Sequence, residues 1–168
     1  MNKMKHAVKI SLMLLTFICI ICACQQEEVA IKEPAFDMEA HKNDFIETLE
    51  KHLDAVTNKD LESLKETLAP TGELYFMLDE RETSKKASDF IKFHEDWFQD
   101  TMWSFETEIT DVEVGRDLGL AITQLIYREP ERNGKPYFNR MAVSYTLKSI
   151  DGQWYIIKDH ATSIERAK

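Results

Sequence analysis

Three histidines are the residues of this chain best suited to proton transfer: His52, His94 and His160. An imidazole changes charge near neutral pH, so each ring could serve as an acid, a base or a hydrogen-bonding group for a ligand. No two of them have the four-residue spacing of a helical metal site, so we expect no metal and no cofactor. Asp159, His160 and Ser163 are too close in sequence to form a hydrolase triad, because their segment lacks a nucleophile turn and an oxyanion donor pair.

Each histidine also has a structural interpretation. His160 shares the alternation of Trp154 and Ile156 if the last strand continues, and it would then face an enclosed surface; alternatively, it bonds to backbone near the strand end. His52 lies beside the apolar stripe of the first predicted helix, where it either lines a pocket or flanks the core. His94 shares a helix face with aromatic residues, which favours a packed histidine.

Aromatic and basic side chains provide the other candidate binding groups. The aromatic candidates for a pocket wall are Phe76, Trp97, Trp103 and Tyr145. Aromatic residues at these spacings can equally belong to an ordinary core. Arg140 and Arg128 could clamp an anion if they face inward, and they only add surface charge if they face outward.

The elements that must position these side chains follow from the apolar periodicity. Between Asp37 and Thr57, apolar residues at three- and four-residue steps predict one long helix with a single stripe: Phe45, Leu49, Leu53 and Val56. Asp60 is expected to cap a second, short helix. Leu74 to Leu78 has the pattern of a strand, followed by a charged loop. Ser84 or Ser88 could cap a third helix.

From Trp103 onward the apolar period changes to two, which predicts strands. The predicted segments are Phe105 to Val114, Leu118 to Tyr127, Tyr137 to Leu147 and Trp154 to Lys158. Gly115-Arg116-Asp117 separates the first two, and Asn133-Gly134 and Asp151-Gly152 separate the others. Asn-Gly and Asp-Gly supply the positive φ angles that tight hairpins require, so we expect an antiparallel meander.

The first two dozen residues predict export and lipidation. A lysine-rich start precedes an apolar run from Ile10 to Ile21, which is too short to span a membrane, since spanning takes roughly 20 apolar residues. The next residues resemble the bacterial lipobox, with the small Ala23 directly before Cys24. We expect residues 1–23 to be a lipoprotein signal peptide and Cys24 to carry acyl chains. Cleavage after Ala23 without lipidation is the alternative, and both place the domain outside the cytoplasm, in the bacterial cell envelope.

Composition limits what the exported chain can be. Cys24 to Lys168 spans 145 residues, the size of one domain, and all three cysteines lie in the signal or at its edge, so no internal disulfide is expected. Without the three signal lysines, 18 basic side chains face 30 acidic ones. This net charge of −12 excludes nucleic acid as a partner and leaves membrane contact to the acyl chains. Residues 24–36 include Pro34 and are expected to be a tether before the domain at 37–168.

The order of elements, helix, helix, strand, helix and then four strands, resembles the nuclear transport factor 2-like superfamily, and within it the SnoaL-like, ketosteroid-isomerase-related domains. The segments that carry the resemblance are Leu53 to Leu64, with Asp60-Leu61 after a helix break, and the closing hairpin Asp151 to Ser163. The resemblance implies an α+β fold, in which a curved mixed, mainly antiparallel sheet wraps around three N-terminal helices as a cone-shaped α+β barrel with a pocket. Such domains often dimerise through the sheet, so a homodimer is an expected assembly.

The isomerase branch of the family needs a carboxylate base and two proton-bearing donors in its pocket. When Asp60 is set on the family's matching aspartate, the resemblance puts His52 at the place of one donor, Ser144 near the other and Phe76 near the base. A phenyl ring cannot abstract a proton, and Asp79 reaches that place only after a three-residue slip. Steroid-type isomerisation is therefore not expected.

The sequence thus predicts a lipid-anchored, extracytoplasmic domain that binds a small, largely apolar ligand or a partner protein without catalysing a reaction. The pocket candidates are His52, Phe76, Trp97, Trp103, Arg140, Tyr145 and His160. One alternative is a SnoaL-like enzyme of isomerase, cyclase or hydrolase type that transfers protons with His52 and His160. Another is a pure protein-interaction module. A pocket with both histidines in reach of one ligand atom would favour the enzyme, and a pocket filled by side chains would favour the interaction module.

The first testable prediction concerns the anchor. Replacing Cys24 with Ser removes the thiol that acyl chains modify, so the protein should move from the membrane fraction to the soluble one, because two chains provide stable anchoring. Fractionation and mass spectrometry of the N-terminal peptide measure this, with Cys22→Ser as the matched control that should stay in the membrane. Membrane retention of Cys24→Ser with no acylated peptide would disprove the assignment.

Overall fold

The computed structural model describes residues 36–77 and 84–168. The expected signal peptide at 1–23, the lipidation residue Cys24 and the tether at 24–36, apart from its last residue, lie outside the described residues. The same holds for Asp79 and most of the charged loop around it. Within the described ranges, no helix is long and apolar enough to cross a membrane.

Among the described residues, three helices precede the long strands: α2 (Met38–Thr57), α3 (Leu61–Glu66) and α4 (Ala87–Trp97). Asp37 caps α2 by accepting hydrogen bonds from two backbone amides, and Asp60 caps α3 by accepting one from the Ser63 amide at 3.1 Å, as the sequence predicts. The expected serine cap of the third helix is wrong. Its N-cap is Lys86, which makes no side-chain cap bond, and the Ser84 hydroxyl donates to Asp89 instead.

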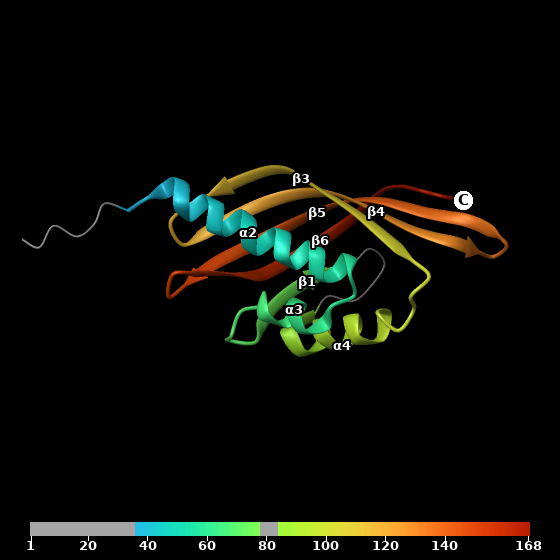
Figure 1. Cartoon of the computed structure of the whole chain (residues 1–168), viewed down its shortest axis with the longest axis horizontal. Helices are drawn as coiled ribbons and strands as arrows, with labels where there is room; N and C mark the ends of the chain where they lie inside the picture. The colour runs from blue at the N-terminus through green and yellow to red at the C-terminus, as the bar shows by residue number, and fades with distance from the viewer. Residues whose placement is uncertain (1–35, 78–83) are drawn as a thin grey trace, which may run out of the picture. The chain divides into compact units, whose positions relative to one another are not determined.

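In the part of the chain that the structure describes, six strands form one curled sheet that does not close, in the order β2-β1-β6-β5-β4-β3. Their bounds are β1 (Glu73–Met77), β2 (Ser84–Lys86), β3 (Ser104–Val114), β4 (Leu118–Arg132), β5 (Lys135–Ile150) and β6 (Gln153–Arg166). β1 runs parallel to β6, and every other neighbouring pair is antiparallel. In Figure 1, α2 lies along one face of the sheet, with α3 and α4 below it beside β1. The expected α+β fold with a curved, mixed, mainly antiparallel sheet and three helices is confirmed.

Two hairpins follow the predicted turn chemistry. Asn133 and Gly134 have φ values of 56° and 79°, and Asp151 and Gly152 have 52° and 83°, so both turns use the left-handed backbone that these residues tolerate. The strands on either side are longer than the apolar alternation indicates. β4 and β5 continue to their hairpin beyond Tyr127 with polar side chains, because backbone pairing there needs no buried face.

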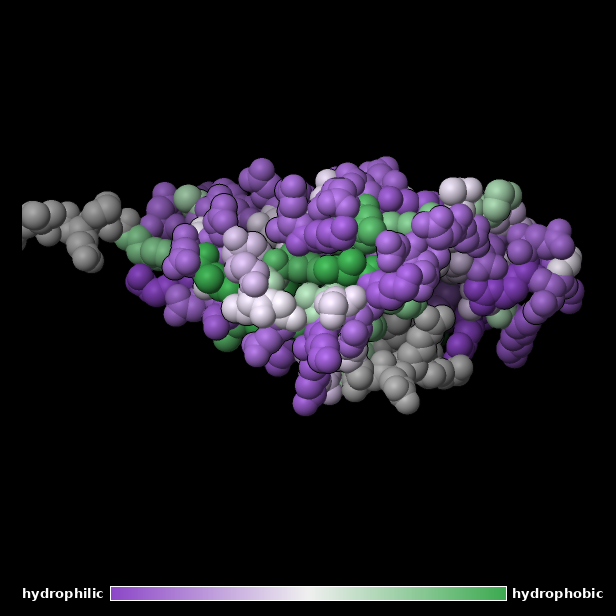
Figure 2. All heavy atoms as spheres, turned by 90° about the horizontal axis from the view of Figure 1, so that it is seen from below, coloured by the Kyte–Doolittle hydropathy of each residue, from purple (hydrophilic) through white to green (hydrophobic). Residues whose placement is uncertain are grey.

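The core lies between α2 and the concave face of the sheet. The predicted stripe of α2 is buried: Phe45, Leu49, Leu53 and Val56. It packs with inward residues of the long strands such as Leu125, Leu147 and Ile156. Each fully buried side chain of this size stabilises the fold by roughly 1.5–3 kcal/mol. Figure 2, which views the molecule from below, shows hydrophilic residues over most of the face in view and hydrophobic ones gathered in a band along its middle.

The closest approach of α2 to the sheet is made at Gly119. A Cβ atom on this residue would lie 2.4 Å from Cε2 of the Phe45 ring. Phe45 is fully buried and meets Trp154 edge-on at 5.2 Å between ring centroids, so the ring has little room to retreat. β4 therefore requires glycine at this position for contact with the helix, at a backbone conformation that other residues could adopt.

The second prediction tests this contact. Gly119→Ala should lower the free energy of unfolding by about 1–3 kcal/mol, because the added methyl overpacks the core. In a Phe45→Leu background, the smaller side chain should accept the methyl, and the cost of Gly119→Ala should fall by at least about 0.5 kcal/mol. Denaturant unfolding of the four proteins measures the coupling. An equal cost in both backgrounds would show that the backbone, not the ring, selects glycine.

Candidate functional site

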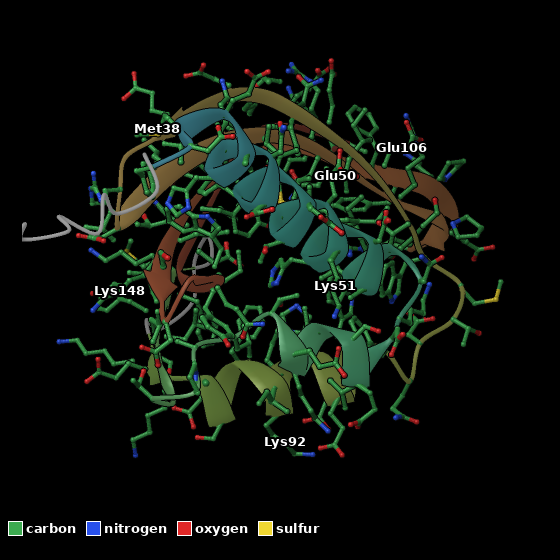
Figure 3. All side chains as sticks on the ribbon, turned by 60° about the vertical axis from the view of Figure 1, so that its left-hand side comes forward. Met38, Glu50, Lys51, Lys92, Glu106 and Lys148 are labelled. Atoms are coloured by element: carbon green, nitrogen blue, oxygen red, sulfur yellow. The ribbon has the colours of Figure 1, made fainter. Side chains whose placement is uncertain are left out.

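A pocket of about 760 Å³ opens between α4 and the inner face of the sheet. One wall comes from α4 and β1, and the floor comes from β4, β5 and β6. Figure 3 shows Lys92 projecting from the outer side of α4, away from the sheet, where it pairs with Asp96 at 2.7 Å. The pocket side of the same helix carries the rings of Phe90, Phe93 and Trp97.

Aromatic side chains form most of the wall. Phe76 meets Phe90 edge-on at 5.3 Å, and Trp97 stacks on Trp103 at 4.2 Å between ring centroids. Of the expected wall residues, Phe76, Trp97 and Tyr145 line the pocket. The expectation that Trp103 lines it is wrong, because this ring is buried behind Trp97.

The tryptophan stack is held from behind by the turn between α2 and α3. Lys59 has a left-handed backbone, with φ of 57°, and its Nζ lies 3.7 Å from the centroid of the Trp103 ring. The same ammonium group donates to the Trp103 carbonyl oxygen at 3.1 Å. A cation over an aromatic face attracts the ring's electrons, so Lys59 fixes the position of Trp103 and, through it, the pocket wall at Trp97.

The floor presents two polar side chains with unused hydrogen-bonding capacity. Asn139 on β5 and Ser163 on β6 both line the pocket. The Asn139 Oδ1 and Ser163 Oγ atoms are buried and have no hydrogen-bond partner among the described residues. A buried polar atom without a partner costs about 1–3 kcal/mol, so these two atoms mark where a bound molecule or water would gain most.

The rim is held by a charged network on β4 and β5. The Tyr127 hydroxyl donates to Glu129 at 2.5 Å, and the Arg132 guanidinium pairs with the same carboxylate. The hydrogen bond from Arg132 holds the pKa of Glu129 below its usual range, and burial raises the pKa of Tyr127. Arg132 also lies 3.5 Å from the centroid of the Tyr137 ring. These groups are engaged with one another and shape the opening.

One extra residue in β6 determines which side chains face the pocket. Thr146 pairs with Lys158, but the next residue of β5, Leu147, pairs with Ile156, so Ile157 is inserted as a bulge. The insertion reverses the alternation of all later residues until a second irregularity near Ile164. Asp159 therefore lies on the inner face.

His160 is a correction to the sequence analysis. The alternation of Trp154 and Ile156 predicts an inward histidine, but the bulge turns His160 outward, where it is exposed and pairs with Ser144 across the ladder. Ser144 also lies on the outer face, one residue before the inward Tyr145, so it is no pocket donor.

His52 is buried below the pocket and does not line it. The Thr67 hydroxyl donates its one proton to the Leu64 carbonyl at 2.7 Å, so its oxygen accepts from His52 Nδ1 at 2.7 Å. Burial, with nearby His94 as a smaller cause, lowers the pKa of His52 to about 3. The ring is therefore neutral, and its Nε2 has no partner among the described residues.

Arg140 and His94 are two further residues that the sequence analysis considered as binding groups. Arg140 is on the outer face, where it pairs with Glu165 at 3.0 Å, so its expected role in the pocket is wrong. His94 is packed as predicted, with Nδ1 donating to the Phe90 carbonyl at 2.9 Å, and it also lines the pocket. Burial lowers the pKa of His94 to about 4, so the ring is neutral and its Nε2 can only accept hydrogen bonds.

Asp159 is a buried carboxyl group next to the pocket that the sequence analysis missed. It pairs with Tyr145 on one side and Phe76 on the other, and both of these line the pocket. Burial raises the pKa of Asp159 to about 7, and its Oδ1 has no hydrogen-bond partner among the described residues. Burial, with the charge of Asp159 as a smaller cause, also raises the pKa of Tyr145. Asn139 and Ser163 were also missed as floor residues, because their positions depend on how far the strands continue.

An open α+β cone with an aromatic pocket is the class of protein that this geometry defines. The SnoaL-like domain family matches residues 46–164, and the chain belongs to this family, which has the nuclear transport factor 2-like fold. No curated protein matches the chain in sequence.

Solved structures at low identity share the fold. A ketosteroid isomerase-like protein from Erwinia carotovora atroseptica has a TM-score of 0.64 and 15% identity, covering 77% of this chain and 99% of its own. The association domain of CaMKII from C. elegans has a TM-score of 0.58 and 18% identity, and the match covers 74% of this chain and 96% of that domain. An LEH-like epoxide hydrolase from M. tuberculosis has a TM-score of 0.55 and 14% identity, and the match covers 72% of this chain and 83% of the hydrolase. Proteins with such different names show that the fold alone does not select a function.

The third prediction follows from the proton on Asp159. Its ordinary pKa of 3.8 rises to about 7 in the fold, so between these values the folded protein holds a proton that the unfolded chain has lost. The free energy of unfolding should therefore fall as pH rises through this window and level off above it, by at most about 4 kcal/mol. His52 and His94 act oppositely, because their lowered pKa values reduce stability as pH falls below 6.5.

The Asp159→Asn variant isolates the aspartate, because both histidines contribute equally to variant and wild type. Its stability relative to wild type should increase from pH 4 to 7 and then stay constant, as measured by denaturant unfolding at each pH. Asp111→Asn removes the same charge from an exposed position of the sheet and is the matched control. A difference that does not change with pH would mean that Asp159 is ionised in the folded protein.

Proposed function

We propose that this chain is a lipid-anchored, extracytoplasmic domain that binds a small, largely aromatic molecule in the pocket between α4 and the sheet. The observation that carries the proposal is the pocket itself: about 760 Å³, walled by aromatic rings and floored by two polar atoms that have no partner in the described part of the chain. This volume is within the 300–1,000 Å³ range of small-molecule sites, which are mostly apolar with a few placed polar groups.

The pocket also bears on the alternatives. Because its volume is open rather than filled by side chains, it supports ligand binding over a pure interaction module. The lipid anchor rests on the sequence before the domain, where acyl chains on Cys24 would hold the protein at the membrane of the cell envelope. A second copy of the chain is a further proposed partner, docking on the outer face of the sheet, where Leu120 and Ile164 are exposed.

A second candidate function is a SnoaL-like enzyme that transfers protons, and one observation favours it. Asp159 stands beside Phe76 in the parallel pairing of β1 and β6, so a carboxyl group is present next to the ring that replaces the isomerase base. With a pKa of about 7, this group could take up or release a proton near neutral pH. In such an enzyme the proton would be transferred by Asp159, and not by His52 or His160.

The fourth prediction tests binding in the pocket. Ala161 lines it from β6, so Ala161→Phe should fill part of the volume and weaken binding of the neutral probe N-phenyl-1-naphthylamine at least tenfold, measured by probe fluorescence. Ala142→Phe makes the same change on the outer face of neighbouring β5 and is the matched control, with affinity unchanged. Equal affinity in both variants would place the probe elsewhere.

The same proteins separate binding from catalysis. A steroid β,γ-enone and an aryl epoxide are suitable test substrates, since structures sharing this fold bear isomerase-like and epoxide hydrolase names. We expect no turnover of either above the uncatalysed rate. Turnover that Asp159→Asn abolishes and His160→Gln leaves intact would establish the enzyme instead.

A further inference from the structure

We infer that the molecule bound in this pocket donates hydrogen bonds through an uncharged polar head on an aromatic body, as a phenol does. This inference rests on the proposed function and adds the chemical class of the ligand. The inference follows from the hydrogen-bonding character of the buried pocket atoms that have no partner among the described residues.

The unused atoms of the floor are acceptors or can act as acceptors. The Asn139 Oδ1 atom only accepts hydrogen bonds, and the Ser163 hydroxyl can accept as well as donate. Both atoms are buried without a partner among the described residues. Met141 pairs with Ser163, and Asn139 is the next residue of β5 on the same face, so the two side chains are diagonal neighbours. One polar head can therefore reach both.

Two further acceptors continue the pattern around the pocket. His94 donates through Nδ1 to the Phe90 carbonyl, which leaves Nε2 as an acceptor on the α4 wall. Asp159 does not itself line the pocket, but it lies on the same face of β6 as Ser163, and the Oδ1 atom of its carboxyl group also has no partner among the described residues. The lining also holds donor groups: Tyr127 and Arg132, which both donate to Glu129, and Arg166.

The walls select the body of the ligand. Phe76 and Trp97 present ring surfaces to the pocket from opposite ends of the α4 wall, and Tyr127 adds a third ring from β4. Aromatic pairs in stacked or edge-on arrangements gain free energy beyond the burial of their area. A flat aromatic molecule would use these surfaces, with its polar end at Asn139 and Ser163.

Three matched probes test the inference: naphthalene, 2-naphthol and 2-naphthoate share one ring system and differ only in the polar group. Each is titrated into the full chain in lipid nanodiscs, with empty nanodiscs as the blank, and quenching of tryptophan fluorescence reports binding beside Trp97. We expect 2-naphthol to bind about tenfold more tightly than naphthalene, because its hydroxyl donates to an acceptor that is otherwise unpaired. We expect no such gain for 2-naphthoate, which has no proton to donate at neutral pH.

Variants of the floor locate the effect. Ser163→Ala and Asn139→Leu should each reduce the advantage of 2-naphthol over naphthalene several-fold while leaving naphthalene affinity unchanged. Asn139→Asp keeps an acceptor oxygen and should preserve the advantage, which also covers the case in which Asn139→Leu fails to fold. Thr162→Val removes a hydroxyl from the exposed face of the same strand and is the matched control for Ser163.

The outcomes separate this inference from the proposed function. If none of the three probes binds, the proposed pocket function fails. If naphthalene and 2-naphthol bind equally, or if the advantage survives both floor variants, the pocket binds aromatic molecules but the donor inference is overturned. If 2-naphthoate binds most tightly and Arg132→Gln removes that preference, the ligand is an anion held at the rim.

Discussion

The bulge at Ile157 is the constraint on which the site depends. β6 lies between β1 and β5, so it contributes to both the helical end of the sheet and the pocket floor. With regular alternation, the inner face after Ile156 would carry Lys158 and His160, a basic floor. The inserted residue replaces Lys158 with Asp159 and His160 with Ala161, and it brings Ser163 inward in place of Thr162, because successive side chains of a strand point to opposite faces. A single backbone irregularity thus gives the inner face of β6 a carboxyl group and a hydroxyl group where regular alternation would place basic side chains.

Burial suppresses charge on the titratable groups in and next to the pocket. The chain is strongly acidic overall, yet burial keeps His52 and His94 neutral and raises the pKa of Asp159 to about 7. All three shifts have the same main cause, since a charge loses its hydration when it is buried. The charged side chains that line the pocket are Asp96, Arg132 and Arg166; Asp96 pairs with Lys92, and Arg132 pairs with Glu129. An uncharged aromatic molecule suits such an interior better than an ion does.

The same structure explains why an open pocket can persist in a stable fold. The wall is rigid because each ring has support behind it: Lys59 holds Trp103, which stacks under Trp97. The core on the other side is closely packed, to the point that β4 tolerates only glycine beside Phe45. The unpaired atoms of Asn139 and Ser163 cost stability that this packing offsets, which is a common arrangement at binding sites.

Local patterns in the sequence determined the helices, the Asn-Gly and Asp-Gly hairpins, the fold and the packed state of His94, because periodicity, capping and turn chemistry act over a few residues. Phe76, Trp97 and Tyr145 were also identified as pocket residues, since aromatic rings on inward positions follow the same periodicity. The tertiary structure decided the rest. It moved His160 and Arg140 outward, buried His52 and Trp103 behind the wall, and brought Asp159 inward. The positions of His160 and Asp159 depend on the pairing register of β6 with β5, and register is set by contacts between strands rather than by the residues of one strand.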